Sequence, residues 1–124
     1  MFLLVSSGTG AQQQARVTGF FSDMHYIQEA GDVLGTEVWI VYGGDRYYAT
    51  VQIAEGSPIP PVVVPVEVSG SRVKFTVREP FVDQDGKPAP DLAIAFDGTV
   101  TRAGLSGTMG SERLDLKRRN SYWQ

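Results

Sequence analysis

The chain of 124 residues contains no cysteine, a single histidine and no long apolar run. The lack of cysteine excludes disulfides, thiolate metal ligands and cysteine nucleophiles together. No apolar run approaches the roughly 20 residues that a membrane-spanning helix requires. We therefore expect a chain without a membrane span. The missing cysteine leaves the cellular compartment open.

Positive charge is also scarce. The sequence has 11 Lys and Arg residues against 14 Asp and Glu, which gives a net charge of -3. Nucleic-acid binding draws its affinity from clustered cations that neutralise phosphates. The one basic cluster, residues 117–119, is short and fits a solvated strand end. We expect no nucleic-acid partner.

The usual catalytic and cofactor motifs are missing as well: no G-x-S-x-G elbow, no phosphate-binding loop and no glycine-rich dinucleotide fingerprint. The lone histidine, His25, lies two residues from Asp23 and shortly before Glu29, so these side chains could supply a general acid and base. A lone histidine near a strand end is more often a surface residue, and tight transition-metal sites need two or more His or Cys ligands. We predict no catalytic residue, metal or cofactor. Asp23, His25 and Glu29 remain the group to test for a barrel isomerase or cyclase.

What the chain does contain is a succession of β-branched and aromatic segments separated by Gly and Pro. Its 14 Gly and 7 Pro suit short strands joined by turns. The strongest hairpin signal is residues 36–55, two such segments joined at Gly44 and Asp45. A two-residue loop there produces a wholly apolar face of cross-strand pairs: Tyr42 with Tyr47, Ile40 with Ala49 and Val38 with Val51.

Similar alternation predicts the other strands. The pattern gives a first strand over residues 17–26, a long loop over 27–35, a hairpin of 62–69 with 72–78, a proline-rich loop over 79–91 and a three-stranded meander over 92–117. In the second hairpin, Gly70 opens a two-residue turn. Its expected apolar pairs are Val68 with Val73, Val66 with Phe75 and Val64 with Val77. In the meander, Phe96 is expected opposite Met109 and Gly98 opposite Gly107, where the sheet can bend.

Together these segments make eight strands joined mostly by short turns. Sequential antiparallel strands without a crossover helix favour an all-β, single-domain, antiparallel up-and-down eight-stranded barrel, because closure removes exposed edges. A two-sheet β-sandwich is the alternative. We place the barrel domain at residues 16–124 and interpret residues 1–15 as a leader, either disordered or the remnant of a signal peptide. A signal peptide predicts a periplasmic or secreted protein; a cytoplasmic location is the alternative.

Segments of the chain resemble two groups of known proteins. Gly19, Phe20 and Phe21 stand where lipocalins carry G-x-W in the first strand, with Phe21 in place of tryptophan, and Arg118 or Arg119 matches the late basic residue that packs on that ring. The chain thus resembles the calycin group of lipocalin, fatty-acid-binding and avidin barrels, although the T-D-Y signature is absent. The segments GFFSDM, GTEVWIVY, VQIAEG and SYWQ are similar to small uncharacterised bacterial exported proteins, a likeness that implies no activity.

The second face of the 36–55 hairpin is the strongest candidate for a binding surface. It mixes aromatic, aliphatic and polar side chains: Glu37, Trp39, Val41, Tyr48, Thr50 and Gln52. Facing inward, this mixture makes a small-molecule pocket. Facing outward, it makes an interface, or the footprint of the leader or of Tyr122 and Trp123. The more uniformly apolar opposite face favours the outward orientation.

Two functions of different class follow. The leading hypothesis is a non-catalytic binding module that holds a small, largely apolar ligand at the barrel mouth or in its interior. The alternative is a structural or oligomerisation protein that uses Trp39, Val41 and Tyr48 as a homodimer interface.

Overall fold

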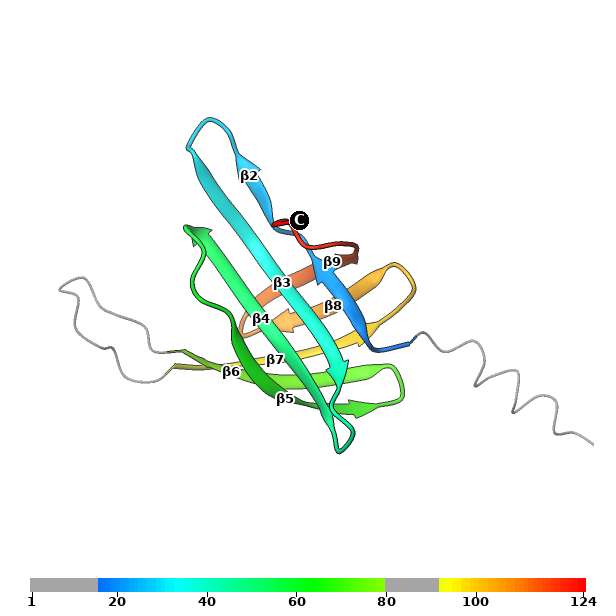
Figure 1. The fold of residues 1–124 in the computed structure, drawn as a ribbon. Coiled ribbons are helices and arrows are strands. Elements are labelled where there is room, and N and C mark those ends of the chain that lie inside the picture. Colours follow the sequence, from blue (N-terminus) through cyan, green and yellow to red (C-terminus); the bar gives the residue numbers. More distant parts are fainter. Residues whose placement is uncertain (1–15, 80–91) are drawn as a thin grey trace, which may run out of the picture.

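The computed structural model describes residues 16–79 and 92–124, which form nine antiparallel strands (Figure 1). The leader expected over residues 1–15 and most of the proline-rich loop lie outside the described residues. In chain order the strands are β1 (Gly19–Ser22), β2 (His25–Ile27), β3 (Asp32–Tyr42), β4 (Tyr47–Gly56), β5 (Val62–Ser69), β6 (Arg72–Glu79), β7 (Leu92–Val100), β8 (Gly104–Met109) and β9 (Glu112–Arg118).

Eight of these strands close into an up-and-down barrel. Strands β3 to β9 pair in sequence, and β1 closes the ring because it pairs with β9 on one side and with β3 on the other. Strand β2 lies outside the ring and extends the sheet beside β3. The predicted all-β, single-domain, eight-stranded barrel is confirmed, and the sandwich does not form.

Short turns fix the predicted register in two places. Strands β3 and β4 pair Tyr42 with Tyr47 and Val38 with Val51. In the meander, Phe96 pairs with Met109 and Gly98 with Gly107, as expected. A Cβ on Gly98 would lie 2.6 Å from the Phe96 ring and from the carbonyl oxygen of Ser106. The phenyl ring of Phe96 thus fills the space that the paired glycines leave at this bend.

The second predicted hairpin forms only in part. Val68 pairs with Val73, but the ladder between β5 and β6 ends at the pair Glu67 with Lys74. Beyond that pair, β5 still pairs with β4 along its other edge but no longer pairs with β6, so the expected pairings of Val66 with Phe75 and of Val64 with Val77 are wrong. The physical reason is Pro65, which has no N–H to donate to β6.

The predicted first strand, residues 17–26, is two strands, β1 and β2, separated at Asp23 and Met24. The amide of Asp23 donates to the carbonyl of Thr36 at 3.1 Å, and the amide of Met24 donates to the hydroxyl of Ser22 at 3.1 Å. The first bond continues the register of β1 with β3, whereas the second takes the Met24 amide out of the ladder, and the Met24 side chain is buried. A side-chain acceptor inside a strand competes locally with the ladder.

The predicted long loop over residues 27–35 is also wrong, because only residues 28–31 form the turn and β3 begins at Asp32. Gly31 has a φ of 71°, which lets its amide donate to the carbonyl of Ile27 at 2.8 Å. Glycine adopts this left-handed conformation without the steric cost that other residues carry. Gly31 therefore closes a tight turn between β2 and β3.

The barrel interior is filled by alternate side chains from all eight ring strands. Phe75 and Phe96 stack in it with ring centroids 4.8 Å apart. Phe21, Val51 and Leu116 have no accessible surface at all. Side chains with no accessible surface border no void that could admit a water molecule, so the barrel is solid at their level.

Arg118 secures the closure of the ring. Its guanidinium carbon lies 4.8 Å from the centroid of the Phe21 ring. Its nitrogens donate to the carbonyl oxygens of Thr18 at 2.9 Å, Arg16 at 2.8 Å and Thr101 at 3.3 Å. Of the two late cations that the lipocalin resemblance suggested, Arg118 is the one that lies on Phe21.

Replacing Arg118 should therefore loosen the closure. Arg118→Met keeps much of the aliphatic stem but removes the cation and its donors, and we expect the free energy of unfolding to fall by about 1–3 kcal/mol. Urea denaturation followed by circular dichroism measures this change. Arg113→Met, at an exposed position of the same strand, should change stability by less than about 0.5 kcal/mol. Equal effects of the two substitutions would contradict a special role for Arg118.

Candidate functional site

The 36–55 hairpin turns its uniformly apolar face into the barrel. Val38 and Ile40 are fully buried, whereas Trp39, between them in sequence, is 48% exposed. The outward orientation follows from the side chains available, because Thr50 and Gln52 would carry polar groups into a core that offers them no partners. The second face is thus an outer surface of β3 and β4.

One end of that outer surface is covered by the C-terminal segment of the chain. Glu37 faces outward yet is only 4% exposed. Its Oε1 accepts a hydrogen bond from the Ser121 hydroxyl at 2.8 Å, and its Oε2 accepts from the Ser22 hydroxyl at 2.8 Å and from the Tyr122 amide at 2.6 Å. A buried carboxylate needs such partners. Glu37 therefore anchors the C-terminal segment to β3.

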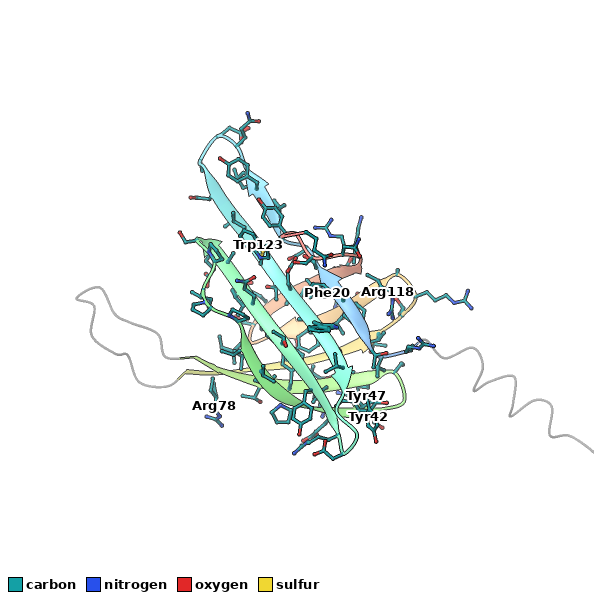
Figure 2. All side chains as sticks on the ribbon, viewed as in Figure 1. Phe20, Tyr42, Tyr47, Arg78, Arg118 and Trp123 are labelled. Carbon is teal, nitrogen blue, oxygen red and sulfur yellow. The ribbon has the colours of Figure 1, made fainter. Side chains whose placement is uncertain are left out.

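Gln52 belongs to the same attachment. Its side-chain oxygen accepts from the indole nitrogen of Trp123 at 2.8 Å, and its nitrogen donates to the carbonyl of Ile59 at 3.0 Å. The ring of Tyr122 meets that of Trp123 edge-on at 4.8 Å. Figure 2 shows Trp123 on the outside of the sheet. Glu37 and Gln52 thus have a structural role in holding the chain end.

The other four predicted residues form part of a larger uncharged surface, which we call the outer apolar face. The strand register aligns its members in two rows across β1, β3, β4 and β5: Phe20, Trp39, Thr50 and Val63 in one, and Val41, Tyr48 and Pro65 in the other. Phe20 stacks on Trp39 with centroids 6.1 Å apart, and Val63 is 68% exposed. An exposed apolar surface on the outside of a barrel is a candidate for an interaction site.

The three acid and base candidates are not brought together. The Asp23 carboxylate accepts the amide of Thr36 at 2.7 Å, and His25 Nδ1 lies 2.8 Å from the backbone carbonyl of Asp23, not from its carboxylate. His25 and Glu29 are exposed. Among residues 16–79 and 92–124, no group of three or more His, Asp and Glu is arranged to hold a metal ion.

The open end of the barrel near the β8–β9 turn holds a hollow that we call the mouth cup. Its volume is 480 Å³. Inward-facing side chains at the strand ends form its floor: Thr36, Ile53, Ile94, Met109 and Leu114. Charged side chains stand at its rim: Asp23, Glu55, Glu112 and Arg113. Three acids against one base make this rim electronegative.

A second hollow, which we call the side cleft, lies in the barrel wall where β5 leaves β6. It has a volume of 680 Å³ and reaches the buried Val64, Phe75 and Phe96. Asp97 also lines it, but Arg72 binds this carboxylate through two hydrogen bonds of 2.9 and 2.6 Å. These hydrogen bonds hold the pKa of Asp97 below its ordinary value.

The sequence did not identify the residues of either hollow, for different reasons. The side cleft has a signal in the sequence, because Pro65 lies inside a strand pattern and a proline there interrupts the hydrogen-bonded ladder. The mouth cup has none in any single segment, because its floor joins Ile53 of β4 to Ile94 of β7 and Leu114 of β9. Only the closed ring brings these strand ends together.

Comparisons with known proteins add no relative. No protein-family model, no curated protein and no solved structure matches the chain. Within the part of the chain that the structure describes, no helix has the length and apolar character needed to cross a membrane. Function is therefore inferred from the geometry of this chain alone.

Removing the Glu37 carboxylate should free the C-terminal segment. In Glu37→Ala the Ser22 hydroxyl and the Tyr122 amide lose a buried acceptor, and we expect the free energy of unfolding to fall by about 1–3 kcal/mol. The Trp123 fluorescence should change at the same time. Urea denaturation and emission spectra measure the two effects. Glu67→Ala, on the exposed side of β5, is the control, and a Glu37→Ala protein as stable as that control would contradict the anchoring role.

Proposed function

We propose that the protein is a non-catalytic binding module that holds a small, largely apolar ligand in the mouth cup. The observation that carries this proposal is the apolar floor at the open end of the barrel, where Met109 and Leu114 are nearly buried and Ile53 and Ile94 are partly so. Ligand sites are concave, mostly apolar and bordered by a few polar groups. The cup is concave, has an apolar floor and is bordered by polar and charged groups.

The depth and charge of the cup limit the ligand. Phe96 and Leu116, both buried, close the barrel beneath the floor, so a ligand rests at the mouth and does not enter the centre. The rim carries Asp23, Glu55 and Glu112 against Arg113. An electronegative rim favours a neutral or cationic ligand over an anionic one.

The architecture supports a calycin-like assignment within this proposal. The ring has eight sequential antiparallel strands, and a late cation, Arg118, lies on the first-strand aromatic Phe21. We include export in the proposal on the composition of residues 1–15, whose apolar start and small residues are typical of a signal-peptide remnant.

A dye that fluoresces in apolar surroundings tests the mouth cup. The neutral dye N-phenyl-1-naphthylamine should bind the wild-type protein saturably. Ile94→Trp fills the cup with a larger ring and should weaken dye binding by about tenfold or more. Thr99→Trp, on the exposed face of the same strand, should bind the dye as the wild type does. Unsaturable binding, or equal binding by both variants, would overturn the proposal.

A second candidate, self-association through the outer apolar face, is favoured by one specific observation. The two rows of this face contain no charged side chain, and Trp39 and Val63 stay exposed although they lie in the middle of the sheet. Charged residues are depleted and aromatic residues enriched at the centres of protein interfaces. A second copy of the chain offers a matching uncharged surface across a two-fold axis.

Analytical ultracentrifugation tests this candidate directly. The wild-type protein should form a dimer, and Trp39→Glu should shift it to monomer, because a charge in the centre of the interface would be desolvated without a partner. Tyr26→Glu changes an aromatic side chain of similar exposure, 54%, on β2 outside this face. That variant should remain dimeric. A wild-type protein that stays monomeric at high concentration would count decisively against the homodimer.

A further inference from the structure

The side cleft exposes backbone hydrogen-bonding groups as well as apolar side chains. Strands β5 and β6 share three ladder pairs next to their turn, and β5 then turns away toward β4 (Figure 1). In the described ranges, no residue pairs with β6 on its β5 side beyond Lys74. The second half of β6 is therefore an open strand edge inside the barrel wall.

Pro65 explains why this edge stays open. The pairs Ser69 with Arg72 and Glu67 with Lys74 set a register that would bring Pro65 opposite Thr76. In an antiparallel ladder such a pair exchanges two N–H to carbonyl bonds, and proline cannot supply its half. The ladder accordingly ends at Glu67 and Lys74, two residues before that position.

The register also tells which groups of β6 point into the cleft. The carbonyl of Ser71 accepts the amide of Val100 on β7 at 2.8 Å, so alternate residues from Ser71 onward face β7. The intervening residues face β5, and among them Thr76 and Arg78 direct both their N–H and C=O groups into the cleft. Across the cleft, the backbone N–H and C=O groups of Val63 point toward β6, because Val63 lies an even number of residues from Glu67, the partner of Lys74.

The side chains around the cleft add a floor and a charged rim. Val64, Phe75 and Phe96 lie at its base. The rim carries three cations against two carboxylates: Arg46, Lys74 and Arg78 against Glu67 and Asp97. Since Asp97 is already bound by Arg72, the remaining charge of the rim is positive. Arg78 points away from the barrel on the outer side of β6 (Figure 2).

We propose that the side cleft binds an extended acidic peptide segment, which adds as a strand to the open edge of β6. Its backbone would pair with the N–H and C=O groups of Thr76 and Arg78, as in other cases of strand addition. Alternate side chains of a strand point to opposite faces, so apolar ones would rest on the floor while acidic ones meet Lys74 and Arg78. This site is separate from the mouth cup and does not depend on it.

A peptide that alternates glutamate with valine over seven residues, blocked at both ends, is the probe. Fluorescence anisotropy of a labelled copy should show saturable binding to the full chain. The same peptide with lysine in place of glutamate should bind about tenfold or more weakly, because its charges repel the rim. A glutamate and valine peptide with alternate backbone nitrogens methylated keeps charge and side chains but cannot pair, and it should not bind.

Matched variants at one position separate backbone from side-chain effects. Thr76→Pro removes the N–H that faces the cleft while leaving the pairing of β6 with β7 intact. It should weaken binding of the glutamate and valine peptide by about tenfold or more. Thr76→Val keeps that N–H and should bind as the wild type does. Circular dichroism establishes that both variants are folded.

Comparing the three peptides on the wild-type protein tests the proposal independently of any change in the stability of a variant. Equal binding of the methylated and unmethylated peptides, or binding of the lysine peptide as tight as that of the glutamate peptide, would overturn it. Loss of peptide binding in Ile94→Trp would also overturn it, because that substitution fills the mouth cup and not the cleft. If Ile94→Trp loses dye binding but still binds the peptide, both the strand site in the side cleft and the ligand site in the mouth cup are supported.

Discussion

The double pairing of β1 is the constraint on which the rest of the structure depends. This four-residue strand pairs with β3 at all of its positions and with β9 at Phe21 and Ser22. Without it, β3 and β9 would both present open edges. So short a strand holds the ring closed because Arg118 donates to the carbonyls of two residues just before it and of Thr101 after β7, and also covers the Phe21 ring. Gly19 permits this approach, since a Cβ there would meet the Arg118 guanidinium.

Closure then determines where a ligand or partner can bind. An eight-stranded ring is just wide enough for its own side chains. Here valines, leucines and the stacked Phe75 and Phe96 occupy that space. Binding is therefore displaced to the places where the ring is incomplete: the strand ends at the mouth cup, the interrupted ladder at the side cleft and the uncovered part of the outer apolar face. Each of these is set by a local feature of the sequence acting on a closed sheet.

Most of the fold could be predicted because strand alternation and turn length are local. A two-residue turn at Gly44 and Asp45 determines every pair of the hairpin that follows, and the same holds for the meander. The break at Asp23 and Met24 could not be predicted in this way. It depends on a donor 13 residues away, because the Asp23 carboxylate accepts the amide of Thr36.

The outer surface of the β3–β4 hairpin likewise has features that the local sequence predicts and features that depend on distant residues. Its orientation follows from comparing the two faces of one strand pair. The fate of Glu37 does not, because its partners Ser121 and Tyr122 lie 84 and 85 residues further along the chain. In the sequence, a carboxylate on a largely apolar face suggests a group that binds a ligand. In the structure, the Glu37 carboxylate anchors the C-terminal segment. Long-range contacts thus decide which polar residues of a face remain available.

The three open surfaces differ in electrostatic character, and this difference limits how they can be used together. The mouth cup has an acidic rim, the side cleft a basic one, and the outer apolar face carries no charge. Because Coulomb attraction and repulsion depend on the sign of charge, a cationic ligand suited to the cup would be repelled at the cleft. The outer apolar face includes Val63 and Pro65 of β5, which also borders the cleft. A second copy of the chain seated there would cover one wall of the cleft and leave the mouth open. Peptide binding and self-association would therefore compete, whereas ligand binding at the mouth would be independent of both.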